Sequence, residues 1–151
     1  MSGETDLIKL YSARILELAA DIPHHGRLED PDASVKRRAP LCGSTVTVDI
    51  KTDGAVITDY AAEVKACALG QASASIVGGH IIGCDLQQVT EARDALKAML
   101  KQDGPTPPAP FDGLEVLRPA KDYKNRHASI LLTLEATVEA LETAQASSSC
   151  A

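Results

Sequence analysis

The stretch STVTVDIKTDGAVITDYAAEVKAC, Ser44 to Cys67, decides the fold that we expect for this chain. Its first part alternates β-branched apolar residues with polar ones, which is the period of a half-buried strand. The dipeptide Asp53-Gly54 follows and is typical of a tight hairpin turn. The sequence therefore predicts an antiparallel hairpin. The side chains of Thr47 and Asp49 are expected on the sheet face opposite to that of Val48. We therefore expect one sheet face to be open to water and the other to meet helices.

Helical periodicity flanks the hairpin on both sides. Apolar residues recur at helical spacing over Asp6–Ala20, which predicts an amphipathic helix. The Ala/Ser-rich run after Cys67 ends at paired glycines, which indicates a closely packed helix with Cys67 at its N-terminal edge. Asp85 is expected to cap a longer helix, and a last helix is expected to open at His127.

The length of 151 residues predicts one domain over 1–151. Polar, Pro and Gly residues indicate a long loop at 22–41 and a Pro-rich loop at 103–112. Residues 145–151 are expected to form a flexible tail. Too little chain follows the Pro-rich loop to build a second core, so it is interpreted as a connection within the domain.

Composition argues against nucleic acid and membranes as partners. Fifteen basic and 21 acidic residues give a formal net charge of −6, whereas a phosphate backbone requires a cationic surface. We find neither a signal-peptide pattern nor an apolar run that could cross a bilayer, and therefore expect a cytoplasmic protein. Thiols stay reduced in that compartment, so the four cysteines are expected to be free or metal-bound.

Cys42 and Cys67 are expected to converge at the open end of the hairpin, because both are nearly equidistant from its turn. Thiolates that meet at one point suit Zn²⁺ or iron, and a helix N-terminus favours the thiolate form of Cys67. His127 is the candidate third ligand, since imidazole commonly joins thiolates around zinc. The alternative is that both cysteines are small packing residues and that the histidine is exposed to water.

Other residues give weaker signals. Cys84 is expected to pack in the core, and Cys150 falls in the predicted tail. Motifs of nucleotide-binding proteins, α/β-hydrolases and zinc proteases are absent from the sequence. We therefore do not expect an enzyme of these classes.

Taken in order, the segments PLCGS around Cys42, the Asp-Gly hairpin, ACALGQASASI around Cys67 and RHASIL around His127 resemble the NifU/IscU family of iron–sulfur cluster assembly scaffolds. The resemblance implies an α+β fold, SufE/NifU-like, in which helices pack on a small three-stranded antiparallel sheet. It also implies a site of three cysteines and an aspartate that assembles a [2Fe-2S] cluster. Such scaffolds take sulfur from a cysteine desulfurase and pass the cluster to recipient apo iron–sulfur proteins.

Carried over by residue, the first two family cysteines fall on Cys42 and Cys67. Ser44 stands where the family has its aspartate. The third cysteine is replaced by His127 or Ala128, with Ser129 as a third register. The ligand set that the resemblance implies for iron, the cluster or zinc is therefore Cys42, Cys67 and His127.

Three functions follow from this resemblance. The first is a scaffold or carrier, not an enzyme, that binds iron or a labile [2Fe-2S] cluster. The second is a zinc-dependent sulfur acceptor that carries a persulfide on Cys67 or Cys42, because the interval from Cys67 to His127 is similar to that of SufU-type relatives. The third is an interaction module that has kept the fold and lost its metal.

Overall fold

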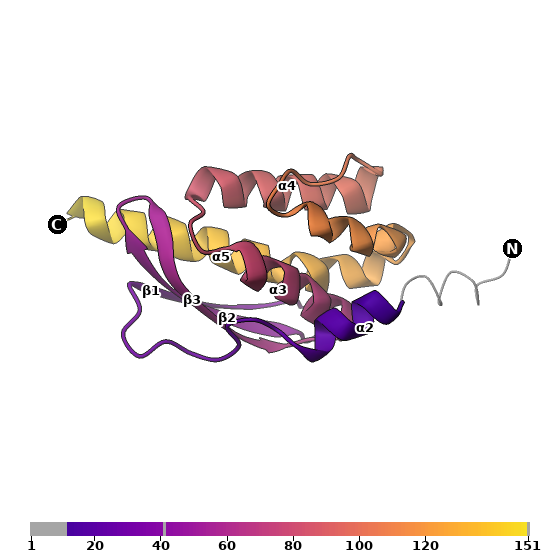
Figure 1. Cartoon of the computed structure of the whole chain (residues 1–151), viewed down its shortest axis with the longest axis horizontal. Helices are drawn as coiled ribbons and strands as arrows, with labels where there is room; N and C mark the ends of the chain where they lie inside the picture. The colour runs from indigo at the N-terminus through magenta and orange to yellow at the C-terminus, as the bar shows by residue number, and fades with distance from the viewer. Residues whose placement is uncertain (1–11, 41, 151) are drawn as a thin grey trace, which may run out of the picture.

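A computed structural model describes residues 12–40 and 42–150, without the side chains of residues 147–150. In chain order its elements are α2 (Ala13–Ala20), β1 (Ala33–Arg38), β2 (Thr45–Asp53), β3 (Val56–Lys65), α3 (Ala68–His80), α4 (Leu86–Gln102), the 3-10 helix η1 (Asp112–Asp122) and α5 (Lys124–Cys150). The strands form one antiparallel sheet in the order β1-β2-β3. Helices α3 and α5 pack on one face of this sheet, and α4 with η1 forms an outer layer over them (Figure 1). The predicted fold, a small three-stranded sheet with helices packed on it, is confirmed.

The β2–β3 hairpin lies where the sequence predicts it, with its turn one residue later than expected. Asp53 pairs with Val56, so Gly54 and Ala55 form the turn, and Gly54 has a φ of +65° that favours glycine. The pairing register shifts between Lys51 and Thr52. At the open end of the hairpin, Thr45 pairs with Lys65 and the two flanking segments leave the sheet together.

The segment 22–41, predicted as a loop, contains the edge strand β1. Its residues Ala33 and Val35 are buried and alternate with exposed neighbours, while the rest of the strand is charged. Only two apolar residues mark this strand, and three basic residues follow them, so the pattern was too short to indicate β structure from sequence. Charged residues on an edge strand also oppose pairing with other chains.

The sheet face opposite the helices is covered around Thr47 and Asp49, which corrects the expectation for these two residues, whereas their cross-strand neighbours Lys36 and Glu63 are exposed as expected. The exposed fractions of Thr47 and Asp49 are 9% and 0%. The chain before β1 crosses this face: the backbone around His24 and Gly26 hydrogen-bonds Ala62 in β3. It then reaches Asp49 in β2 and enters β1 on the far side. The segment before β1 therefore covers the part of this sheet face around Asp49.

The helix starts follow local capping chemistry. Ser12 caps α2, and residues 6–11 of the helix predicted there lie outside the described residues. Cys67 occupies the N-cap position of α3, and Asp85 caps α4 in a capping box with Gln88, as predicted.

Two further segments differ from the sequence predictions. Helix α5 begins at Lys124, three residues before His127, and continues to Cys150 through most of the segment predicted as a tail. The loop from Asp103 to Phe111 has no helix or strand, and η1, which was not predicted, follows it. Among the described residues, no helix is both long and apolar enough to span a membrane.

Candidate functional site

The first part of the site is a tight turn between β1 and β2 that presents Cys42. The Gly43 N–H donates to the Ala39 carbonyl at 2.9 Å, and the Ala39 N–H donates to the Ser44 carbonyl at 2.8 Å. Gly43 has a φ of +73°, which side-chain-bearing residues rarely adopt, and open space surrounds the position of a Cβ there. Glycine is thus needed for the backbone conformation of the turn, and it holds Cys42 exposed to solvent.

Cys67 enters the site from the other strand of the hairpin. It follows β3 directly, occupies the N-cap position of α3 and is half-buried. Gln71 in the first turn of α3 donates to the Ala66 carbonyl at 2.9 Å, which fixes the passage from strand to helix. The predicted convergence of Cys42 and Cys67 at the open end of the hairpin follows from this arrangement.

Two serines connect the thiols. Cys42 Sγ donates to Ser44 Oγ at 3.2 Å, and Ser44 Oγ lies 3.1 Å from Ser129 Oγ. Ser129 Oγ in turn lies 3.6 Å from Cys67 Sγ. A hydrogen-bonded chain of four side chains therefore joins Cys42 to Cys67, and both of its serines are buried.

Close packing of α3 against α5 places Ser129 in this chain. A Cβ at Gly70 would meet Ser129 Oγ, and it would lie 3.2 Å from the Ser129 carbonyl oxygen. One turn further along α3, Ser73 Oγ donates to the Ile130 carbonyl at 2.7 Å. Of the three residues left open by the sequence for the third position, Ser129 has its side chain beside Cys67, whereas Ala128 is exposed.

His127 lies in a different environment from the two cysteines. Its side chain is 2% exposed, and its Nε2 lies 2.9 Å from the carbonyl oxygen of Ala120 in η1. The ring's Nδ1 has no hydrogen-bond partner among the described residues. Among the side chains that the structure describes, in residues 12–40 and 42–146, no three from His, Cys, Asp or Glu lie together as a metal site. The structure thus brings together Cys42 and Cys67 and leaves His127 beside η1.

The surroundings of Cys42 favour its thiolate form. The pKa of this thiol is lowered, first because the Ser44 hydroxyl can turn to donate a hydrogen bond to the thiolate, then by the Ser44 backbone N–H and, more weakly, by the charge of Arg126. Arg126 was not singled out from the sequence. It precedes Ser129 by three residues on α5, the spacing that places side chains on one helix face, and this was the available signal.

Cys84, which lies outside this site, packs in the core as predicted. Cys84 is buried, its thiol donates to the His80 carbonyl at 3.3 Å, and burial raises the pKa of this thiol. It is a packing residue.

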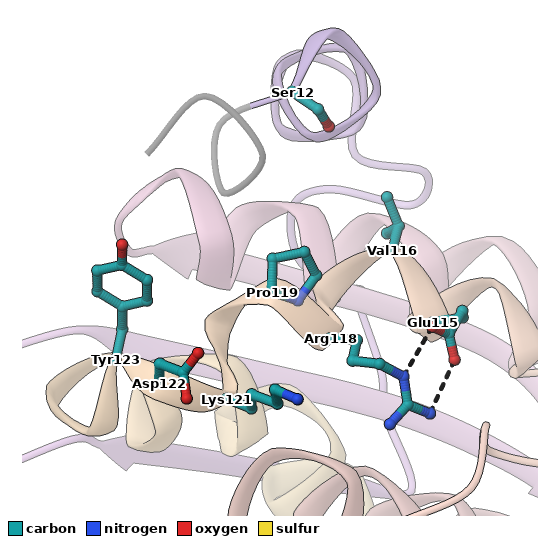
Figure 2. A pocket seen from close by; sticks show the side chains of 8 residues that line it. All are labelled: Ser12, Glu115, Val116, Arg118, Pro119, Lys121, Asp122 and Tyr123. Atoms are coloured by element: carbon teal, nitrogen blue, oxygen red, sulfur yellow. Dashed lines mark hydrogen bonds and ion pairs between the residues drawn. The ribbon is translucent and has the colours of Figure 1, made fainter. Parts of the chain in front are cut away.

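A separate hollow of about 560 Å³ lies between Ser12 and η1. Figure 2 shows its lining, in which the Arg118 guanidinium is paired with Glu115. The same guanidinium donates to Asp103 at 2.8 Å, and Lys121 lies 3.4 Å from that carboxylate. The cations of this hollow are thus already paired with carboxylates of the chain, and neither Cys42 nor Cys67 lines it.

Comparison with known proteins decides the family. Residues 10–129 match the model of the NifU-like N-terminal domain. This chain belongs to that family. The iron–sulfur cluster assembly scaffold protein IscU of Thermotoga maritima is 25% identical over 138 residues, which are 88% of this chain and 93% of the relative.

Solved structures agree with this assignment. The N-terminal NifU-like protein of Brucella abortus is 43% identical with a TM-score of 0.91, and the match covers 93% of this chain and 98% of that one. A scaffold protein of the SUF system from Fervidobacterium islandicum is 25% identical with a TM-score of 0.77, covering 89% and 98%. The chain is therefore a NifU-like domain, and its candidate site contains Cys42 and Cys67 with Ser44 and Ser129 between them.

Proposed function

We propose that this NifU-like domain is a carrier in iron–sulfur cluster assembly. It would hold iron or a labile [2Fe-2S] cluster as cargo on Cys42 and Cys67 and pass it to apo-proteins. The observation that supports this proposal is the hydrogen-bonded chain that brings the two thiols to one exposed end of the sheet. Sulfur would come from a cysteine desulfurase, and the reducing cytoplasm, where thiols stay free, is the proposed compartment.

The donor set suits a transient cargo. Two thiolates are soft ligands for iron, whereas serine hydroxyls are weaker donors at neutral pH. Coordination positions of the iron that the chain does not fill are open to exchange, which favours release to a recipient protein. His127 keeps an unpartnered Nδ1, but its ring does not lie together with the two thiols as a metal site among the described residues, so Cys42 and Cys67 are the ligands in this proposal.

Anaerobic reconstitution tests the carrier function. The full chain is mixed with ferric iron, sulfide and glutathione, desalted, and examined by visible absorption and circular dichroism. We expect the wild type and Cys84→Ser to give the same cluster spectrum, because Cys84 lies outside the site. Cys42→Ser and Cys67→Ser should lose most of the signal, and His127→Ala should keep it. An unchanged spectrum in Cys67→Ser would contradict the proposal.

A second function, acceptance of sulfur as a persulfide, is favoured by the exposure and lowered pKa of Cys42. In that reaction the Cys42 thiolate attacks the outer sulfur of the desulfurase persulfide. An S–S bond forms on Cys42, the S–S bond of the desulfurase breaks, and its cysteine leaves as a thiolate. Zinc bound at the same thiolates is part of this alternative.

Mass spectrometry after incubation with desulfurase and cysteine tests the second function. One added sulfur atom on the Cys42 peptide, absent in Cys42→Ser, would support it, and an unmodified protein would contradict it. Metal analysis of protein purified without chelator tests the zinc. If the protein contains neither metal nor persulfide and forms no cluster, the chain is an interaction module with the fold alone.

A further inference from the structure

The number of thiols at the site is the starting point. A [2Fe-2S] cluster is ordinarily held by four thiolates, two on each iron. Among the described residues the site provides two, Cys42 and Cys67, and the serines between them occupy the inner side. A cluster on this domain therefore needs two thiolates from outside the site.

The position of Cys42 leaves room for an added ligand. The thiol is exposed, and open space surrounds the neighbouring Gly43. Cys67 is half-buried behind it and bonded to Ser129. External ligands can therefore approach from the solvent side of Cys42, while the protein covers the opposite side.

Cationic side chains gather at this end of the molecule. The charge of Arg126 lowers the pKa of the Cys42 thiol. Arg38 and Lys65 are the two strand partners of Thr45, which follows the turn that contains Cys42. None of the three forms an ion pair within the described parts of the chain. The nearest acidic residue of this strand end is Glu63, two positions further along β3. Arg38 and Lys65 share the sheet face of Thr45, opposite the helices, and Arg126 comes from α5, so cations without an ion pair among the described residues flank both sides of this end of the molecule. They contrast with the acidic net charge of the chain.

We propose that a small thiol with carboxylate groups binds at this site and supplies the two missing thiolates to the cluster. This inference rests on the carrier function proposed above. Each thiol loses its proton to solvent as its sulfur binds iron, and no oxidation state changes. The carboxylates pair with Arg126, Arg38 and Lys65, and these cations also offset the negative charge of four thiolates.

The same cations argue against a second copy of this chain as the source of thiolates. A cluster shared by two copies would bring Arg126 and its counterpart together, with Arg38 and Lys65 of both copies nearby. Like charges at that separation repel unless anions lie between them. A small anionic thiol is instead attracted to these cations.

Reconstitution of the full chain in three reducing solutions tests the proposal. The first contains a phosphine and no thiol, the second glutathione, and the third 2-mercaptoethanol at the same thiolate concentration. We expect glutathione to give the highest cluster yield, and native mass spectrometry to show one chain with one cluster and two glutathiones. Arg126→Gln should lower the glutathione yield by about threefold to fivefold, the scale of one exposed charge-assisted interaction. Arg93→Gln, on α4 and paired with Asp94, is the matched control and should change nothing.

Each remaining outcome contradicts the inference in a recognisable way. An equal yield with phosphine alone would overturn it and leave the carrier function intact, provided that Cys67→Ser still abolishes the cluster. Equal yields with 2-mercaptoethanol and glutathione would remove the role of the carboxylates. One cluster on two chains would assign the missing thiolates to a second copy. Absence of cluster in all three solutions would overturn the carrier function itself.

Discussion

Ser129 gives the sharpest test at the scale of single residues. Its Oγ lies between Ser44 and Cys67, so a cysteine at this position would add a third thiol to the pair. We expect Ser129→Cys to raise the cluster yield in the phosphine solution, where no other thiol is present. The measurement is visible circular dichroism after desalting, combined with iron and sulfide analysis.

The neighbouring position provides the control for that prediction. Ala128 is exposed whereas Ser129 is buried beside Cys67, so Ala128→Cys should leave the yield in phosphine at the wild-type level. A gain for Ala128→Cys without one for Ser129→Cys would show that the helix presents the other residue to the site. Thermal unfolding of both variants would verify that each is folded.

Ser44 is expected to control the reactivity of Cys42. Its side chain makes the largest contribution to the lowered pKa of the Cys42 thiol. Ser44→Ala should raise this pKa and slow alkylation of Cys42 several-fold at neutral pH, because the thiolate is the reacting form. Iodoacetamide labelling followed by peptide mass spectrometry across pH measures the shift.

Two controls accompany the labelling experiment. Thr45→Val changes the next residue and should leave the pH profile of Cys42 in place. Cys84, which is buried and has a raised pKa, should label slowly in every variant. A Cys42 profile that does not move in Ser44→Ala would show that the hydrogen bond at 3.2 Å has no influence on the thiol.

At this scale the sequence predicted the thiols and could not predict their neighbours. The alternation of β2 and the Asp-Gly turn were enough to bring Cys42 and Cys67 together. The side chain that α5 directs at them depends on the rotation of the helix about its axis. Contacts with Gly70 and Ser73 of α3 set this rotation, and such long-range contacts leave no local pattern near Ser129. For the same reason, the acceptor of His127 in η1 was not predictable.

Among the elements, the contact between α3 and α5 is predicted to be intolerant of added volume. A methyl group at Gly70 would meet Ser129 Oγ and lie 2.9 Å from Ala66 Cβ. We expect Gly70→Ala to destabilise the fold by about 1–3 kcal/mol, the usual cost of overpacking. Urea unfolding followed by far-ultraviolet circular dichroism measures this change.

Gly79, in the same helix, supplies a matched control. A Cβ there would meet only Pro23 Cγ, at 3.8 Å. Gly79→Ala should therefore be neutral, or stabilising by about 0.5–1 kcal/mol, because alanine is the better helix former. If the two substitutions had equal effects, close packing at Gly70 would not be what holds α5 in position.

Elements with strong local signals were predictable, and those that depend on neighbours were not. Asp85 and Gln88 specify the start of α4 by themselves through side-chain hydrogen bonds to the backbone. Strand β1 has two inward apolar residues and exists because β2 offers it a hydrogen-bonding edge. Helix η1 contains Pro119 and is held by buried Leu114 and Leu117, so tertiary contacts outweigh its weak local preference.

At the scale of the whole molecule, Asp49 holds the covering segment, the chain before β1 that contains Arg27 and Leu28, against the sheet. Its buried carboxylate accepts hydrogen bonds from Arg27 at 2.7 Å, Ser34 at 2.6 Å and the Leu28 N–H at 3.0 Å. These donors come from the segment before β1 and from β1 itself. The burial of Asp49 could not be predicted from the sequence, because its hydrogen-bond donors lie 15 to 22 residues away along the chain.

The stability of the fold should therefore depend on the ionisation of Asp49. Desolvation raises the pKa of this carboxyl, but the hydrogen bonds from Arg27, Ser34 and Leu28 outweigh it, so the pKa is lowered in the folded state. The stabilisation is present above the unfolded-state pKa of about 4 and is lost as the pH falls through the lower folded-state pKa. Asp49→Asn should cost about 1–3 kcal/mol at neutral pH, since it removes a buried charge-assisted hydrogen bond.

Urea unfolding of the wild type, Asp49→Asn and Asp59→Asn between about pH 3 and 7 separates this contribution from general acid effects. The difference between the wild type and Asp49→Asn should be largest at neutral pH and shrink toward pH 3, because protonation removes from the wild type what the variant already lacks. Asp59 is exposed on β3, so Asp59→Asn should follow the wild type throughout. A constant difference across this range would mean that Asp49 stabilises the sheet by packing and neutral hydrogen bonds, and that its charge has no part in holding the covering segment.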